Sequence, residues 1–236
     1  MLDAIDLTRA KDGDPPLLIH RIRLSLRAGD RLALIGPSGS GKTILLRALA
    51  FLDPLDEGAI FWRGEQVGGN RVPVFRSRVV YLHQRPDWTA GTVEQVLREP
   101  LSLEVHRHRA FSRDRIVGWL SRLGRSASFL EQSTRDLSGG ELQLLALMRI
   151  VQLDPNILLL DEPTAALDPT TTSAVEGWLM DWCDQAADRA YVWVTHDMVQ
   201  ATRVSRRVIR MERGELVAPT ATPSGLPQSR RYPSQE

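Results

Sequence analysis

Apolar runs of the length of buried β-strands recur along the whole chain. They cover residues 2–7, 22–26, 32–35, 60–62, 79–82, 157–160, 191–195 and 208–211. The later runs are continuously apolar and alternate with segments of helical periodicity, which is typical of a parallel sheet covered by helices on both faces. The pattern therefore predicts an α/β fold built around a parallel sheet.

The first runs are shorter, and turn-forming residues interrupt them. Glycine, proline, aspartate and asparagine gather at residues 12–16, 28–30 and 68–70. Such clusters between short strands are typical of hairpins. We therefore expect an antiparallel β edge subdomain beside the parallel sheet.

The strand pattern stops between about residues 87 and 136. Residues 93–97, 113–123 and 127–131 have helical patterns instead, which predicts a helical subdomain inserted into the core. From residue 219 onward Pro, Ser, Thr and Arg dominate with almost no apolar periodicity. We therefore expect one domain over residues 1–218, with a helical subdomain at about 87–136, and a disordered tail at 219–236.

Composition adds a few limits to this picture. The chain of 236 residues is 42% hydrophobic, and its net charge of +1 gives no overall attraction to nucleic acid, so we expect no nucleic-acid partner. Cys183 is the single cysteine, which excludes an intrachain disulfide and a thiol-rich metal site. No apolar run approaches the roughly 20 residues that span a bilayer, and the first residues lack the features of a signal peptide. We expect a soluble protein that reaches a membrane only through a partner.

One eight-residue stretch between an expected strand and an expected helix has the composition of a phosphate-binding loop. It consists of Gly36, Pro37, Ser38, Gly39, Ser40, Gly41, Lys42 and Thr43. The glycines let successive backbone N–H groups point at one anion, and the following helix adds its N-terminal dipole. Lys42 supplies a charge for the outer phosphates, and Thr43 supplies a hydroxyl for Mg²⁺. This P-loop predicts binding of a nucleoside triphosphate, and by itself leaves kinases, GTPases and ATPases open.

A second motif offers another anion site at a helix N-terminus. It consists of Ser138, Gly139, Gly140 and Glu141, followed by apolar residues that continue a helix. Ser138 and Glu141 have the spacing of a capping box, which could be their whole role. A serine and two glycines at a helix N-terminus can also bind a phosphate.

Two adjacent carboxylates follow the apolar strand at residues 157–160. Asp161 is expected to hold Mg²⁺, directly or through water, and Glu162 to orient or deprotonate an attacking water. A buried strand with a polar end is the alternative for this segment alone. The P-loop upstream favours the catalytic interpretation.

Taken in order, these motifs resemble those of the nucleotide-binding subunit of ATP-binding-cassette (ABC) transporters, over about residues 2–217. Three further positions carry the resemblance. Gln84 matches the family's glutamine loop, Asp168 its D-loop, and His196 its switch histidine.

The resemblance implies a P-loop NTPase (RecA-like) core that binds ATP and Mg²⁺ and hydrolyses ATP. It assigns residues 36–43 to ATP, and Thr43, Gln84 and Asp161 to Mg²⁺. Hydrolysis is then assigned to Lys42, Gln84, Glu162 and His196.

The resemblance also implies how the subunit assembles. Residues 138–141 of one subunit cap the γ-phosphate on the P-loop of another, and Asp168 lies across the interface, so that two ATP molecules are enclosed in a homodimer. The dimer drives a separate polytopic membrane permease. Its expected location is therefore the cytoplasmic face of the cell membrane, as a peripheral protein.

Two positions depart from the family pattern. The family has an aromatic residue upstream of the P-loop that stacks on adenine, whereas no Phe, Tyr or Trp occurs here before Phe51. Arg9, Lys11 or His20 would have to cover the base, or stacking is absent, so we expect weak base discrimination. Leu144 stands where the family usually has arginine after the signature motif.

Two features of the expected helical region bear on partners. The basic run at residues 106–115 predicts either a solvated face or a contact with a partner or lipid. Trp88 follows the glutamine loop, where the family docks its membrane partner.

A finer resemblance concerns the transported substrate. The short segment from Gln84 to the signature motif, residues 149–152 and Trp193 resemble the ATP-binding subunits of small two-component bacterial systems proposed to export iron. The alternative function is a soluble ABC ATPase that acts on ribosomes or DNA, although this chain has one cassette and no heptads. A small-molecule kinase would leave residues 137–143 and His196 unexplained.

Overall fold

The structure, a computed structural model, describes residues 1–11, 14–83 and 90–217. The strands are β1 (Leu2–Lys11), β2 (Asp14–Leu26), β3 (Arg31–Ile35), β4 (Glu57–Trp62), β5 (Glu65–Gln66), β6 (Val79–Leu82), β7 (Ile157–Asp161), β8 (Ala190–Val194), β9 (Arg207–Glu212) and β10 (Glu215–Val217). The α-helices are α1 (Lys42–Leu49), α2 (Val72–Arg78), α3 (Val93–Arg98), α4 (Arg113–Arg122), α5 (Gly139–Val151), α6 (Pro169–Asp184) and α7 (Met198–Val204). Short 3₁₀ helices are η1 (Gly69–Arg71), η2 (Glu99–Ser102), η3 (Glu104–His106), η4 (Ala127–Glu131) and η5 (Thr134–Asp136).

The predicted parallel sheet is present and forms the centre of the α/β fold. Its strand order is β10-β9-β3-β8-β7-β6, and all neighbours are parallel except β9 and β10. Every residue of β7 and β8 is buried. Both faces of these strands must therefore be covered, which explains why their sequences are continuously apolar.

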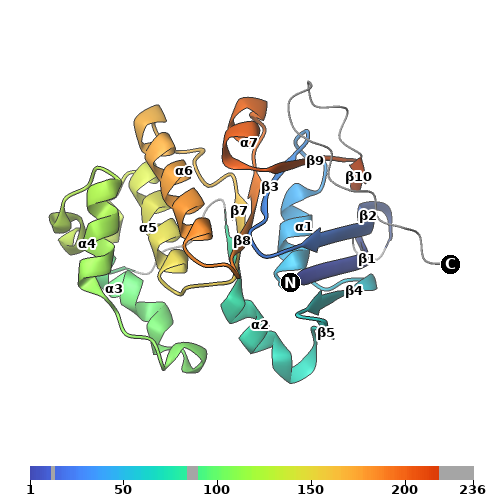
Figure 1. Cartoon of the computed structure of the whole chain (residues 1–236), viewed down its shortest axis with the longest axis horizontal. Helices are drawn as coiled ribbons and strands as arrows, with labels where there is room; N and C mark the ends of the chain where they lie inside the picture. Colours follow the sequence, from blue (N-terminus) through green and yellow to red (C-terminus); the bar gives the residue numbers. More distant parts are fainter. Residues whose placement is uncertain (12–13, 84–89, 218–236) are drawn as a thin grey trace.

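Two hydrophobic clusters cover the two faces of the parallel sheet. Figure 1 shows α4, α5 and α6 on one side of the sheet and α1 on the other. On β8 the alternation is direct: Tyr191 and Trp193 belong to one cluster, and Val192 and Val194 belong to the other. Helices α3, α4, α5 and α6 pack in the first cluster, whereas α1 packs in the second together with β1 and β2. The P-loop strand β3 thus lies between two well-packed layers.

The early strands form a second, antiparallel sheet of order β2-β1-β4-β5. Strand β1 pairs with β2 on one side and with β4 on the other, both antiparallel. The expected antiparallel subdomain is therefore confirmed, although its strands make a sheet of their own. Leu7, Ile19 and Ile22 from this sheet are buried against Leu45 and Leu49 of α1.

Every named element that the structure describes between β6 and β7, over residues 90–156, is an α- or 3₁₀ helix. Helices α3 and α4 begin where the sequence predicts them, and residues 127–131 form the 3₁₀ helix η4. Within the described part of the chain, no helix combines the length and the apolar character needed to cross a membrane. Gln84, Trp88 and the expected tail at 219–236 lie outside the described residues.

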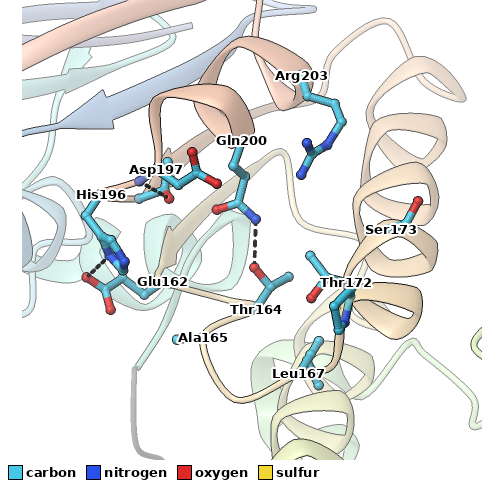
Figure 2. Close-up of a pocket in the computed structure, with 12 residues that line it drawn as sticks. Glu162, Thr164, Ala165, Leu167, Thr172, Ser173, His196, Asp197, Gln200 and Arg203 are labelled. Atoms are coloured by element: carbon cyan, nitrogen blue, oxygen red, sulfur yellow. Dashed lines mark hydrogen bonds and ion pairs between the residues drawn. The ribbon is translucent and has the colours of Figure 1, made fainter.

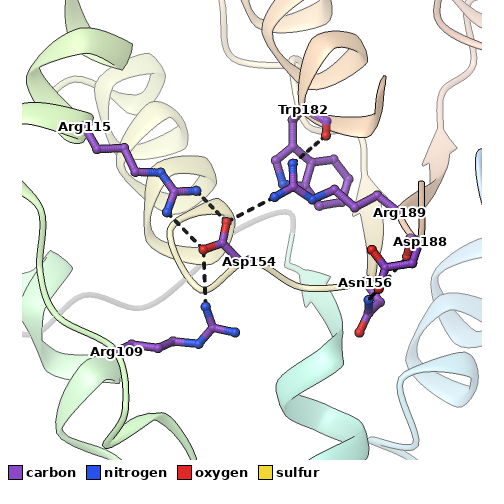
Figure 3. Close-up of polar contacts among 7 residues, drawn as sticks. All are labelled: Arg109, Arg115, Asp154, Asn156, Trp182, Asp188 and Arg189. Atoms are coloured by element: carbon purple, nitrogen blue, oxygen red, sulfur yellow. Dashed lines mark hydrogen bonds and ion pairs between the residues drawn. The ribbon is translucent and has the colours of Figure 1, made fainter. Parts of the chain in front are cut away.

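Three arginines surround Asp154 in the loop between α5 and β7 (Figure 3). Arg115 of α4 donates to both carboxylate oxygens, at 3.1 and 2.5 Å, Arg109 donates at 3.3 Å, and Arg189 donates at 3.2 Å. Burial alone would raise the pKa of Asp154, but the hydrogen bond and charge of Arg115, with Arg189 and Arg109, outweigh it and lower that pKa. Two members of the basic run thus tie α4 and its preceding loop to the sheet.

Candidate functional site

The loop between β3 and α1 is held against two other segments of the chain. A Cβ at Gly36 would lie 2.2 Å from the Met211 carbonyl oxygen of β9, and one at Gly41 would lie 2.6 Å from the Leu18 carbonyl oxygen of β2. Gly36 and Gly41 also have φ angles of 150° and 103°, which favour glycine. Glycine is therefore required at both ends of the loop, and α1 begins directly after it at Lys42.

Lys42 is folded back over the loop that it follows. Its Nζ donates hydrogen bonds to the carbonyl oxygens of Gly36, at 2.9 Å, and Pro37, at 2.8 Å. Burial lowers the pKa of Lys42, and the carboxylates of Glu162 and Asp161 partly oppose this effect. The ammonium group is thus placed beside the loop and the two carboxylates, where a polyphosphate can replace its carbonyl partners.

A hydroxyl from the start of α1 contacts the carboxylate at the end of β7. Thr43 Oγ1 donates to Asp161 Oδ2 at 2.7 Å, and the Tyr81 hydroxyl donates to the same oxygen at 3.1 Å. Asp161 is buried at the end of β7, and burial together with its charge raises the pKa of Tyr81. The Thr43 hydroxyl and the Asp161 carboxylate are hard oxygen donors, which fit Mg²⁺.

Mg²⁺ sites of this type need few protein ligands, because phosphate and water oxygens complete the coordination. Within residues 1–11, 14–83 and 90–217, no group of three or more His, Cys, Asp or Glu side chains is placed to hold a metal ion. Thr43 and Asp161 would therefore hold Mg²⁺ together with the phosphates.

Glu162 and His196 face each other across the ends of β7 and β8 (Figure 2). Glu162 Oε1 lies 3.7 Å from His196 Nδ1, and the His196 side chain is 77% exposed. Glu162 has a φ of 49°, a left-handed conformation that costs a non-glycine residue of the order of 1–3 kcal/mol. Glu162 thus has a strained backbone directly after the end of β7, and such strain is common in catalytic sites.

A buried network fixes the helix that follows His196. Gln200 of α7 donates to the Thr164 hydroxyl at 2.9 Å and to Glu176 of α6 at 2.8 Å, as Figure 2 shows for Thr164. Arg203 completes the network with two hydrogen bonds to Glu176, at 2.5 and 2.8 Å. Because these contacts join α7 to α6 and to the segment after Glu162, they hold the two sides of the Glu162–His196 pair in place.

A cavity of about 780 Å³ collects most of the residues expected to bind nucleotide or to act on it. The predicted residues that line it are Gly36, Ser38, Gly39, Gly41, Lys42, Thr43, Asp161, Glu162 and His196. Pro37 and Ser40 belong to the same loop without lining the cavity; Pro37 accepts from Lys42, and Ser40 is buried. The site therefore combines an anion cradle, oxygen donors for a cation, and a carboxylate that can take up a proton.

The expected second anion motif lies outside this cavity. Ser138 caps α5 and exchanges hydrogen bonds with Glu141 in a complete capping box. These bonds lower the pKa of Glu141. Gly139 and Gly140 form the first turn of α5, and a Cβ at Gly140 would lie 3.0 Å from the Ala166 carbonyl oxygen. This motif is thus packed against the segment after Glu162, and its capped N-terminus does not line the cavity.

Asp168 likewise does not line this cavity, and it caps α6. Its carboxylate accepts from the Thr171 N–H at 3.0 Å and from the Thr171 hydroxyl at 2.6 Å. These hydrogen bonds lower its pKa. Asp168 therefore has a structural role within the chain.

The side chains considered for covering the base make other contacts. Arg9 forms an ion pair with Asp53, and His20 Nδ1 lies 2.9 Å from Glu215. The side chain of Lys11 lies outside the description. Leu18 and Arg213 line the cavity instead. No sequence motif could have identified them, since Leu18 belongs to β2 and Arg213 to the turn between β9 and β10.

Comparison with known proteins gives relatives for nearly the whole chain. A family model described as "ABC transporter" matches residues 19–165. The phosphate import ATP-binding protein PstB 2 of Natronomonas pharaonis is 34% identical over 221 residues, which cover 86% of this chain and 75% of that protein. The histidine/lysine/arginine/ornithine transport ATP-binding protein HisP of Salmonella typhimurium is 31% identical over 231 residues, which cover 91% of this chain and 87% of that protein.

Solved structures agree with the sequence relatives. The structure of MJ0796, described as a dimeric bacterial ABC transporter cassette, has a TM-score of 0.81 and 25% identity, over 92% of this chain and 96% of that one. A second MJ0796 dimer, in a post-hydrolysis state bound to ADP and Pi, has the same TM-score at 24% identity and the same coverage. The chain therefore has the fold of these cassettes.

Proposed function

Because the chain belongs to the ABC transporter family of ATP-binding subunits, and is an ABC ATPase, we propose that it hydrolyses ATP in the cavity between the P-loop, Glu162 and His196. The single observation that carries the proposal is that the P-loop and Glu162, whose backbone is strained, line the same cavity. Each described residue then has a role that its contacts support.

Lys42 and the N–H groups of residues 36–43 bind the phosphates. Lys42 exchanges its two carbonyl partners for phosphate oxygens, and it neutralises charge that develops on the transferred phosphoryl group. Thr43 and Asp161 hold Mg²⁺, which supplies charge neutralisation at the phosphates when it is bound. Gln84 is proposed as a further ligand for Mg²⁺ and lies outside the described residues.

Glu162 orients the attacking water and accepts its proton. Its carboxylate sits at the open end of β7, beside His196 at 3.7 Å. His196, which is largely exposed on that side, is then in position to contact the γ-phosphate. Positioning and charge stabilisation account for the catalysis, since phosphoryl transfer needs little covalent chemistry from the protein.

The remaining proposed ATP contacts come from a second copy of the chain. Residues 138–141 do not line the cavity of their own chain, but the capped N-terminus of α5 can bind an anion. We propose that this N-terminus caps the ATP of a second subunit, and that Asp168 lies at the same interface. ATP is then held between two subunits, and hydrolysis separates them.

The dimer drives a separate polytopic permease from the cytoplasmic face of the membrane. Residues 1–218 are proposed as the nucleotide-binding domain, with the helical subdomain at about 87–136 inserted in its core. The Asp154 cluster joins α4 of this subdomain to the loop before β7.

We propose metal-ion export, for example of iron, on a sequence resemblance alone: that of residues 149–152, Trp193 and the short segment from Gln84 to the signature motif. The relatives PstB 2 and HisP carry the names of phosphate import and amino-acid transport. Their names therefore do not favour a metal cargo.

The test captures a tagged Glu162→Gln variant from detergent-solubilised native membranes. The variant keeps the shape of the side chain and loses the base, so it should bind ATP and stall before hydrolysis. A polytopic membrane protein that co-elutes only with ATP and Mg²⁺ supports the transporter subunit, and its relatives identify the cargo class. Ribosomal or DNA-bound material in its place would favour the soluble ABC ATPase. Lys42→Ala serves as the matched control, because it should capture neither.

A further inference from the structure

The turn between β9 and β10 is fixed against the P-loop. Glu212 pairs with Glu215, so the turn consists of Arg213 and Gly214, with φ angles of 48° and 83°. Two positive φ angles are characteristic of a type I′ hairpin turn. Gly214 N donates to the Ser40 carbonyl oxygen at 2.9 Å and its own carbonyl accepts from His20 N at 2.8 Å. The position of Arg213 is therefore set by the same loop that binds the phosphates.

Arg213 lines the nucleotide cavity and is exposed. Within the described part of the chain its guanidinium has no hydrogen bond and no ion pair. Leu18, which is half-buried, lines the same cavity, and among the described lining residues His196 has the only aromatic ring. A planar cation and an apolar side chain are thus available to a ligand here.

A second turn of the same type shows that an arginine in this turn can find partners within the chain. Arg63 and Gly64 join β4 to β5 with φ angles of 54° and 82°. The Arg63 guanidinium lies 4.9 Å from the centre of the Trp62 ring and 3.5 Å from Asp188. Arg63 therefore has partners within the chain, whereas Arg213 faces a cavity.

The direction of the nucleotide follows from the two ends of the cavity. The outer phosphates belong near Lys42 and Thr43, beside Asp161 and Glu162. Leu18 and Gly214 instead contact the loop before Lys42, at Gly41 and Ser40. The nucleoside therefore extends toward Leu18 and Arg213, away from the two carboxylates.

We propose that Arg213 stacks its guanidinium on the base of the bound nucleotide, with Leu18 as an apolar wall of the same subsite. The inference rests on the proposed ATP site and adds a residue that binds the base of the nucleotide, whichever base it is. Guanidinium stacking uses the π-face that every base has, so it strengthens binding with little choice between adenine and guanine.

The test compares Arg213→Asn with Arg63→Asn. Asn-Gly is favoured in a type I′ turn, so both variants should keep the fold, with melting temperatures equal to or above that of the wild type. Equilibrium binding is measured with ATP, with GTP and with inorganic tripolyphosphate, which has no base. Arg213→Asn should weaken ATP and GTP binding by roughly 2- to 30-fold and leave tripolyphosphate binding unchanged. Arg63→Asn should leave all three unchanged.

Arg213→Lys separates stacking from charge. It keeps the positive charge and loses the planar group, so it should also weaken ATP binding. Unchanged ATP binding in Arg213→Asn would overturn the inference, and so would equal weakening of ATP and tripolyphosphate, which indicates a phosphate contact. Wild-type protein that binds neither ATP nor tripolyphosphate would instead overturn the proposed function.

Discussion

At Lys42, the contacts of a single side chain indicate what the site binds. The ammonium group is buried beside two carboxylates and satisfies its donors with carbonyl oxygens of its own loop. Burial would be unfavourable for a charge without such partners. An incoming polyphosphate offers stronger, charged acceptors in the same place.

We expect Lys42→Ala to reduce ATP hydrolysis by about 10²–10³-fold, because one donor to the developing charge is lost. Phosphate release from ATP measures the change, and far-ultraviolet circular dichroism checks the fold. Arg63→Ala, which removes a cation outside the cavity, is the matched control and should hydrolyse ATP normally. A wild-type rate of ATP hydrolysis in Lys42→Ala would mean that Lys42 has no part in the reaction.

Sequence reasoning found the residues of the site that belong to motifs and missed those that reach it from elsewhere. The side chains of Lys42, Asp161, Glu162 and His196 could be placed because each lies at the end of a parallel strand or in the segment after it. These strand ends meet at one edge of the sheet. Arg213 has no motif, and its approach to the P-loop depends on tertiary packing of a hairpin turn. The strained φ of Glu162 is also invisible in the sequence.

At the scale of elements, the N-terminus of α5 separates a structural role from a functional one. Ser138→Ala should lower the free energy of unfolding by about 1 kcal/mol, because the capping hydrogen bond is lost. It should also slow ATP hydrolysis if this N-terminus contacts ATP of a second subunit. Chemical denaturation and phosphate release measure the two effects.

The chain contains a matched control for this experiment. Thr92 and Gln95 form a complete capping box on α3. Thr92→Ala should cost a similar free energy of unfolding and leave hydrolysis unchanged once the protein is folded. Equal losses of activity in both variants would mean that Ser138 acts only as a helix cap.

The Asp154 cluster predicts a pH dependence of stability. Its pKa is lowered in the folded state, so the carboxylate stabilises the fold above the unfolded pKa of about 3.9 and loses this contribution as pH falls through the lower folded value. Asp154→Asn should cost about 1–3 kcal/mol at pH 7, toward the lower end because the side chain is 35% exposed. The difference from wild type should shrink below about pH 4.

Denaturant titrations at pH 7 and at pH 3.5 measure this difference. Asp181→Asn is the control, since Asp181 also pairs with an arginine but is 56% exposed, and it should cost less than about 1 kcal/mol. An Asp154→Asn penalty that does not vary with pH would mean that the arginines stabilise the fold without the carboxylate charge.

Elements with strong periodicity could be predicted from the sequence, and short or interrupted elements could not. Strand β6 was predicted over its full length because it is a continuous apolar run. Strand β2 extends well before the predicted residues 22–26, because prolines and an aspartate at its start obscure the pattern. Helix α2, of 7 residues, and strand β10, of 3 residues, are too short to establish a period.

At the scale of the whole molecule, the P-loop and the N-terminus of α5 do not share a cavity within one chain. The cradle, Glu162 and His196 share a cavity, whereas the capped N-terminus of α5 lies elsewhere. Two copies related by a twofold axis would complete two such sites, and the similar MJ0796 cassette is described as dimeric. ATP would then stabilise the dimer by mass action.

The rate of phosphate release from ATP, measured over a wide range of protein concentration, tests this account most directly. A site shared between two copies predicts that the rate per subunit rises with protein concentration, and that Glu162→Gln lowers it at every concentration. A rate per subunit that is independent of concentration, and equal in wild type and Glu162→Gln, would contradict both the shared site and the role of Glu162.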